Sequence, residues 1–191
     1  MDLPTKKIEE NQGIKGRLTF TNFLLLSERA REIDAFLKTA TNLQAHVYDR
    51  LVRELRSLCE IKTFQVDNLV VLTGREVFAR RLIGDSTYTG AINYGALGTD
   101  NTAVNSADTT LGVEVARKLF SRRTRTNAQV DLDFFYSQSD TDGTYEEFGT
   151  FIDGAATADS GVLFNHALTG GWTKTDTEAM TVSLTVTISD S

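Results

Sequence analysis

Residues 182–188 have the sequence Val182-Ser183-Leu184-Thr185-Val186-Thr187-Ile188, in which apolar and hydroxyl-bearing side chains alternate. A period of two is typical of a strand with one buried face, because successive side chains of a strand point to opposite sides. Further short strand patterns, separated by turn-forming residues, occur at 113–120, 128–136 and 145–152. Short strands spaced by turns favour an antiparallel arrangement over a parallel α/β fold. We therefore predict a mainly antiparallel β-sandwich.

The first 60 residues predict an N-terminal arm and a helix pair. Residues 1–16 are polar and form the predicted arm, and residues 17–23 alternate as a strand would. Ser27 is suited to cap a first helix, because its hydroxyl can accept from the first helical turn. Thr41 and Gln44 have the spacing of a capping box for a second helix. The apolar positions recur at helical spacing at Ala30, Ile33, Leu37 and Ala40, and then at Leu43, Val47, Leu51, Leu55 and Leu58.

The chain is therefore predicted to be α+β. Residues 1–60 would form the N-terminal arm and helical segment, and residues 61–191 a β-sandwich-like assembly domain. Within the second segment, Asp67-Asn68 suggests a bend in a strand region. A short helix is expected over residues 75–82, with Val77, Phe78 and Leu82 directed inward.

The composition is that of a globular chain: 191 residues, of which 40% are hydrophobic and 24% charged. The longest strongly apolar run, residues 23–26, is far shorter than the about 20 residues that cross a bilayer. The N-terminus lacks the apolar core of a signal peptide. We therefore expect synthesis in a cytoplasm and no membrane partner. Cys59 is the only cysteine, which excludes an intrachain disulfide.

The charge is distributed unevenly along the chain. Residues 1–84 carry 14 Lys and Arg against 11 Asp and Glu, whereas residues 85–191 carry 6 against 15. This asymmetry is compatible with ordinary surface variation. It would also suit a head-to-tail assembly in which the basic half of one copy meets the acidic half of the next. The overall net charge of −6 disfavours general binding to nucleic acid.

The sequence predicts no catalytic residue, no cofactor and no metal site. Ser160 lacks the surrounding G-x-S-x-G motif of a serine hydrolase. Cys59 and His46 would lie about 20 Å apart along one helix, too far for a thiol dyad. Asp131 and Asp133 would share the solvent-facing side of a strand rather than act as paired catalytic carboxylates. A zinc site would need more His and Cys ligands than the chain offers, although a calcium ion at the acidic turns, Asp140, Asp142 and Asp153, stays open.

A basic cluster, Arg122, Arg123 and Arg125, lies between two predicted strands and is expected to form a turn. It lacks the flanking aromatic residues that stack on nucleic-acid bases. We interpret these arginines as interface residues that pair with carboxylates of a neighbour, and Glu146 and Glu147 are candidate partners.

Several segments, in order and spacing, resemble a pattern of tailed-bacteriophage virion proteins. The resemblance begins with Asn68-Leu69-Val70-Val71-Leu72-Thr73-Gly74-Arg75 and residues 81–85, and continues through Ile92-Asn93-Tyr94-Gly95-Ala96-Leu97-Gly98-Thr99. It extends over residues 107–117, Gly143-Thr144-Tyr145-Glu146-Glu147-Phe148-Gly149-Thr150-Phe151 and the terminal segment 174–189. Phe148, Thr150 and Met180 depart from the family pattern, and the N-terminal helices are not covered.

The resemblance implies a structural subunit of a tailed-phage virion, located in the tail, neck, baseplate or capsid surface, with no enzymatic activity. Its partners would be other copies of itself and other virion structural proteins. Two alternatives remain: a host- or glycan-binding module on the virion surface, and a hydrolase without a recognisable motif.

Overall fold

The computed structural model describes residues 13–189. The last four of the residues predicted as an arm, 13–16, begin the first strand, and residues 1–12 lie outside the described range. The elements of the described range, in chain order, are β1 (Gly13–Leu24), α1 (Glu28–Thr39), α2 (Ala45–Leu58), β2 (Glu60–Val70), α3 (Leu72–Leu82), β3 (Ile92–Gly98), β4 (Glu114–Leu119), β5 (Arg122–Thr126), β6 (Gln129–Tyr136), β7 (Gly143–Ile152), β8 (Val162–Lys174) and β9 (Glu178–Ser189).

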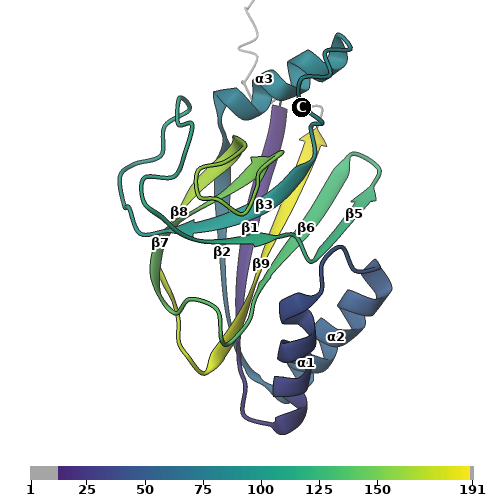
Figure 1. Ribbon diagram of the computed structural model, residues 1–191, viewed down its shortest axis with the longest axis vertical. Helices are drawn as coiled ribbons and strands as arrows, with labels where there is room; N and C mark the ends of the chain where they lie inside the picture. Colours follow the sequence, from purple (N-terminus) through teal and green to yellow (C-terminus); the bar gives the residue numbers. More distant parts are fainter. Residues whose placement is uncertain (1–12, 190–191) are drawn as a thin grey trace, which may run out of the picture.

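The strands form one antiparallel sheet in the order β4-β3-β7-β8-β2-β1-β9-β6-β5. The sheet curls into a half-barrel, with α3 at one end and α1 and α2 against one outer side (Figure 1). The prediction of a mainly antiparallel β structure with helices is confirmed, whereas the two-sheet sandwich is not. β1 is central to the sheet, since Leu18 pairs with Val66 on one side and with Leu184 on the other.

The interior of the half-barrel is filled by the alternating side chains that the sequence pattern predicts. Val182 and Leu184 of β9 are fully buried there, and Val186 nearly so. Phe20 of β1 and Phe148 of β7 meet edge to face, with ring centroids 5.7 Å apart. Burying each such side chain stabilises the fold by about 1.5–3 kcal/mol relative to leaving it in water.

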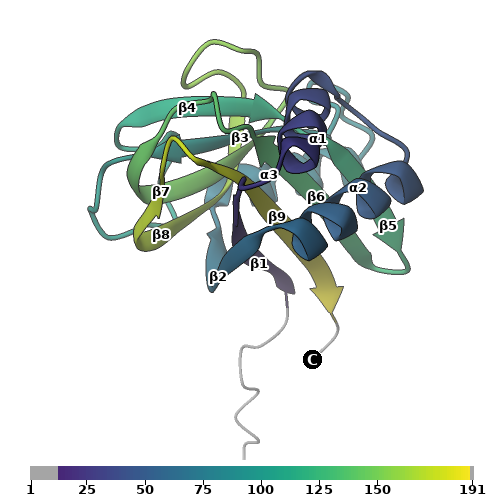
Figure 2. The ribbon, with the colours of Figure 1, turned by 90° about the horizontal axis from the view of Figure 1, so that it is seen from below.

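A second apolar cluster lies between α1, α2 and the outer face of β6 and β9, and Figure 2 shows both helices on this side of the sheet. β6 is therefore buried on both faces, with Phe134 inside and Phe135 under the helices. The solvent-facing position predicted for Asp133 is wrong, because residues of α2 surround it and it is 6% exposed. Periodicity within β6 indicates which residues share a face, but not that a distant helix pair covers it.

The helix starts were predicted with mixed success. Ser27 caps α1 as predicted, and its Oγ accepts from the backbone N–H of Ala30 at 3.1 Å. The capping box at Thr41 is wrong: α2 begins after Gln44, which is its N-cap residue and makes no side-chain capping hydrogen bond. The bend at Asp67-Asn68 is also absent, since β2 continues through both residues in register with β1.

α3 lies across one end of the half-barrel and begins earlier than predicted, at Leu72. Val77 is buried as expected, and Phe78 packs on Phe164 at a centroid distance of 5.9 Å. Leu82 does not point inward: it is 88% exposed, and the following Ile83 is 83% exposed. The helix extends beyond the sheet that would have covered its last turn.

Candidate interaction site

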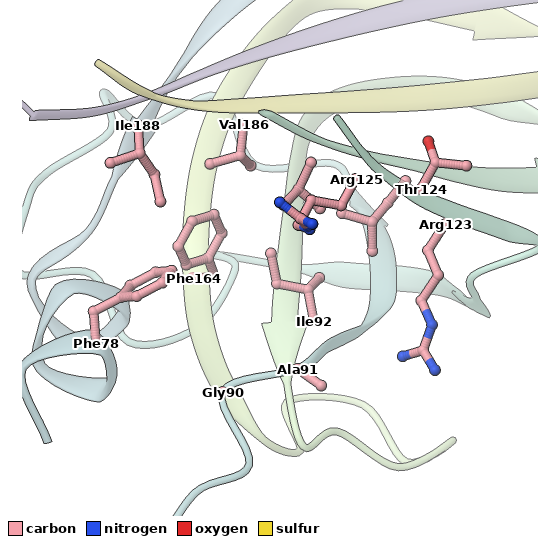
Figure 3. Close-up of a pocket in the computed structure, with 12 residues that line it drawn as sticks. Phe78, Gly90, Ala91, Ile92, Arg123, Thr124, Arg125, Phe164, Val186 and Ile188 are labelled. Atoms are coloured by element: carbon pink, nitrogen blue, oxygen red, sulfur yellow. The ribbon is translucent and has the colours of Figure 1, made fainter. Parts of the chain in front are cut away.

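An apolar pocket opens at the end of the half-barrel beside α3, and Figure 3 shows its lining. We call it the mouth pocket. Its volume is about 420 Å³, within the range of protein pockets that bind ligands or partner side chains. Its apolar walls come from α3, β3, β6, β8 and β9: Phe78, Ile92, Leu132, Phe164, Val186 and Ile188.

Two arginines of β5 stand at the rim of the mouth pocket. Figure 3 shows the guanidinium of Arg125 turned toward the cavity and that of Arg123 at its edge. Arg125 donates to the backbone carbonyl of Asn127 at 2.8 Å, and Arg123 lies 4.8 Å from the ring centroid of Phe120. Within residues 13–189, neither guanidinium forms an ion pair with a carboxylate. The rim therefore offers positive charge beside an apolar hollow.

The apolar character continues outward along α3. Leu82 follows Phe78 by four residues, which places both on one side of the helix. Leu82 and Ile83 are the two most exposed large apolar residues of the described chain. Large exposed apolar side chains next to a pocket are typical of contact surfaces.

Arg122, the third predicted interface arginine, has a different environment. The cluster is the strand β5 rather than a turn, so Arg122 points away from the mouth pocket toward α2. Its Nη1 lies 2.7 Å from Asp133 and its Nε lies 3.0 Å from Asp49, and its side chain is 17% exposed. Burial raises the pKa of Asp133, and the hydrogen bonds from Ser183 and Arg122 offset part of that effect. Arg122 thus joins α2 to the sheet.

Glu146 and Glu147 lie on β7, and no ion pair within residues 13–189 joins them to the three arginines. Glu146 is half-buried. Glu147 is 1% exposed, and its carboxylate accepts from the backbone N–H groups of Gly112 at 3.0 Å and Val113 at 2.9 Å. Within the chain, Glu147 therefore anchors the segment 99–113 to the sheet.

His166 completes this anchor, which sequence reasoning missed. Its Nε2 lies 2.8 Å from Glu147 and its Nδ1 lies 2.8 Å from Asp108, and we call these three residues the carboxylate–histidine clamp. Burial alone would lower the pKa of His166, but the bonds to Glu147 and Asp108 outweigh it and raise that pKa. Burial would raise the pKa of Glu147, yet the hydrogen bonds from His166, Val113 and Gly112 lower it. Each shift favours the charged form of its group.

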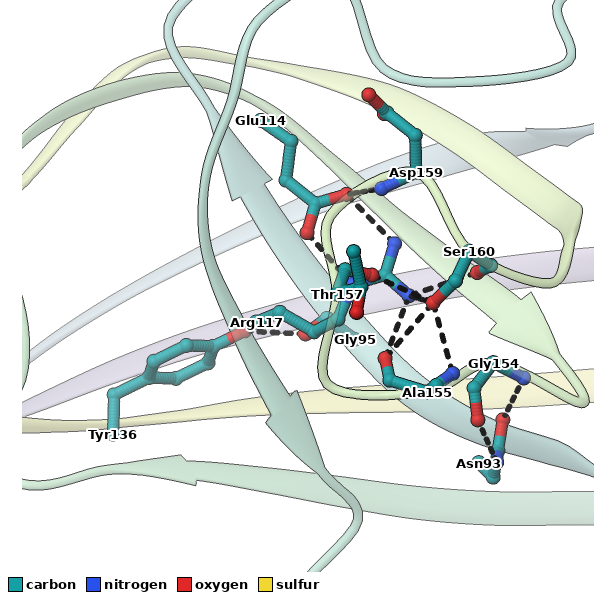
Figure 4. Close-up of polar contacts among 10 residues, drawn as sticks. All are labelled: Asn93, Gly95, Glu114, Arg117, Tyr136, Gly154, Ala155, Thr157, Asp159 and Ser160. Carbon is teal, nitrogen blue, oxygen red and sulfur yellow. Dashed lines mark hydrogen bonds and ion pairs between the residues drawn. The ribbon is translucent and has the colours of Figure 1, made fainter.

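A second internal network holds the segment between β7 and β8 against β4, as Figure 4 shows. Arg117 and Glu114 form a bidentate pair with distances of 2.6 and 2.7 Å, and their side chains are 4% and 3% exposed. Arg117 Nη1 also donates to the Ser160 carbonyl at 2.8 Å. The Ser160 hydroxyl donates within the loop, at 2.6 Å to the Thr157 carbonyl. Ser160 therefore serves loop structure in this arrangement.

The acidic turns are likewise engaged in contacts within the chain. Asp140 pairs with Lys118 at 2.7 Å, and Asp153 accepts from the backbone N–H of Thr89. Among residues 13–189, no group of three His, Cys, Asp or Glu side chains is arranged to hold a metal ion. In the same range, no helix combines the length and the apolar character needed to cross a membrane.

Comparisons with family models, with curated proteins and with solved structures find no match to this chain. The geometry of its own surface is therefore what bears on function, together with the ordered sequence segments described above.

Proposed function

We propose that the chain is a non-enzymatic structural subunit of a tailed-phage virion, located in the tail, neck, baseplate or capsid decoration, and that it acts through protein–protein contacts. Its partners would be further copies of itself and other virion structural proteins. The proposal draws on the order and spacing of the segments that resemble phage virion proteins, which extend over residues 68–189.

The single structural observation that supports the proposal is the open contact surface at the α3 end. It combines the mouth pocket, two rim arginines without a carboxylate partner in the described range, and the exposed pair Leu82 and Ile83. Apolar anchors surrounded by polar groups are the usual composition of protein interfaces. The polar residues that could suggest chemistry, such as Glu147 and Ser160, are occupied with internal contacts.

Two measurements test this function. Mass spectrometry of purified particles, from the phage that carries the coding sequence, should find the protein at a copy number typical of a structural component. Light scattering across concentration should show self-association that the double substitution Leu82→Asp/Ile83→Asp reduces, with an unchanged circular dichroism spectrum. Absence from the particles would refute the virion assignment.

A host- or glycan-binding module is the second candidate, because a polar pocket lies beside the carboxylate–histidine clamp. Its volume is about 310 Å³, and Asp100, Thr102, Thr109 and Thr110 contribute to its lining. Hydroxyl and carboxylate groups of this kind can form hydrogen bonds with a sugar. Saturable binding of the isolated protein on a glycan array, lost on Asp100→Ala, would favour this candidate.

A further inference from the structure

We propose that the mouth pocket receives the N-terminal segment Ile8-Glu9-Glu10 of a second copy of this chain. The Ile8 side chain would enter the cavity, and the two glutamates would pair with Arg125 and Arg123 at its rim. This inference rests on the proposed assembly function and specifies one contact that builds the assembly.

The first argument is the chemistry of the pocket. Its walls are apolar, so an aliphatic side chain gains free energy by leaving water for them. Its rim has two guanidinium groups that lack a carboxylate partner within residues 13–189. The matching ligand is a peptide in which an aliphatic residue is followed directly by carboxylates, since Arg binds carboxylates through paired hydrogen bonds.

The second argument is the composition of the chain before β1. Residues 1–12 contain the run Ile8-Glu9-Glu10, which has the order that the pocket and its rim would recognise. A 12-residue segment can span up to about 40 Å when extended, which is enough to reach an adjacent molecule.

The third argument is where β1 begins. Ile14 pairs with Ile188, and Ile188 lines the mouth pocket, so the chain enters the sheet at the end that carries the pocket. A segment that precedes β1 in a neighbouring copy could approach this end extended, with both carboxylates free to pair with the rim.

Two single substitutions in the full-length chain test whether the N-terminal segment of one copy inserts into the mouth pocket of another. Ile8→Asp removes the apolar side chain that would enter the pocket, and Ala91→Trp fills the pocket from an exposed position at its rim. Each variant alone should associate at least about tenfold more weakly than the wild type by light scattering, the loss expected when a buried interface anchor is removed. An equimolar mixture should recover a one-to-one complex, because one variant keeps the pocket and the other keeps the segment.

The mixture distinguishes exchange between copies from insertion within one copy. A mixture that stays monomeric overturns the inference, as does an Ala91→Trp variant that associates like the wild type. In the second case the wild type still oligomerises, so the proposed assembly function would survive the loss of this contact. A wild type that is monomeric at every concentration also overturns it. Ile61→Asp, an exposed position on β2, is the matched control and should leave association unchanged.

A charge exchange tests the rim separately. Arg123→Glu/Arg125→Glu and Glu9→Lys/Glu10→Lys should each weaken association. Equimolar mixing of the two should restore association through two contacts. In one, the unchanged Glu9 and Glu10 face the unchanged Arg123 and Arg125, and in the other, the introduced Lys residues face the introduced Glu residues. Failure of this mixture, with both variants folded by circular dichroism, would remove the arginines from the contact.

Discussion

Glu147 and His166 lie 2.8 Å apart inside the sheet, and their contact favours the ionised form of each. The arrangement is costly to disturb, because removing one member of a buried pair leaves the other charge without compensation. Its effect on stability must depend on pH, since the pKa of His166 is raised and that of Glu147 is lowered in the folded chain.

His166→Gln should lower the free energy of unfolding by about 3 kcal/mol at mildly acidic pH, as for other broken buried pairs. A raised folded pKa means that the stabilisation is complete below about 6.5, the unfolded value, and is lost as pH rises through the folded pKa. The wild-type and variant stabilities should therefore converge toward alkaline pH. Urea unfolding from about pH 5.5 to about pH 9 measures this.

The exposed His46 provides the matched control, and His46→Gln should leave that pH profile unchanged. A stability difference between wild type and His166→Gln that is independent of pH would contradict a charged imidazole in the clamp. As pH falls through the lowered pKa of Glu147, the carboxylate protonates and its contribution should also be lost.

Some helices and strands can be predicted from their own residues, whereas other features depend on contacts with distant parts of the chain. β9 follows from alternation within seven consecutive residues, and the start of α1 follows from Ser27 alone. Both could be predicted because the decisive contacts are local. Asp133 and Glu147 could not be placed, since their partners, Ser183 and His166, lie on distant elements that only the tertiary arrangement brings near. The inward position predicted for Leu82 was wrong for the same reason. Helical spacing shows which residues share a face of a helix, but not where the sheet that covers this face ends.

The two caps predicted from the sequence make a paired test at the helix starts. Ser27→Ala should destabilise the protein by about 1 kcal/mol, because the backbone N–H of Ala30 loses its acceptor. Thr41→Ala should change stability by less than about 0.5 kcal/mol, as expected for an exposed position without such a contact. Thermal or urea unfolding of both variants measures these changes. A larger loss of stability for Thr41→Ala than for Ser27→Ala would support the capping box at Thr41.

The close packing of α3 against β8 depends on the absence of a side chain at Gly74. A Cβ there would lie 2.5 Å from the Phe164 carbonyl oxygen and 2.8 Å from its Cα, both backbone atoms. Helix propensity alone predicts that Gly74→Ala stabilises the protein by about 1 kcal/mol. Close packing predicts a loss of about 1–3 kcal/mol, and we expect the loss in urea unfolding. Glu76→Ala, exposed on the same helix, controls for the added alanine.

For the whole molecule, the two halves of the chain carry opposite net charge while the sheet joins them into one body. The basic rim of the mouth pocket therefore belongs to a chain whose net charge is −6. Contacts between such copies would depend on local charge matching, because the overall charges repel.

Self-association should consequently weaken as salt is added. The screening length falls from about 10 Å at 0.1 M to about 3 Å at 1 M ionic strength, which reduces attraction between exposed charges. Light scattering at low and high NaCl should show a higher apparent dissociation constant at high salt for the wild type. Arg123→Gln/Arg125→Gln should flatten this dependence, whereas association that strengthens with salt in both proteins would point to apolar contact alone.

The central position of β1 has a consequence for biogenesis. β1 pairs with β9, and Leu18 lies opposite Leu184. β1 is synthesised early and β9 last, so this pairing cannot form until the end of the chain has been made. At a translation rate of about 5–20 residues per second, the delay amounts to roughly 10–30 s. During that interval the apolar side of β1 has no completed sheet to join, and non-local pairing of this kind closes slowly. The nascent chain is therefore expected to expose the apolar side of β1 until β9 has left the ribosome.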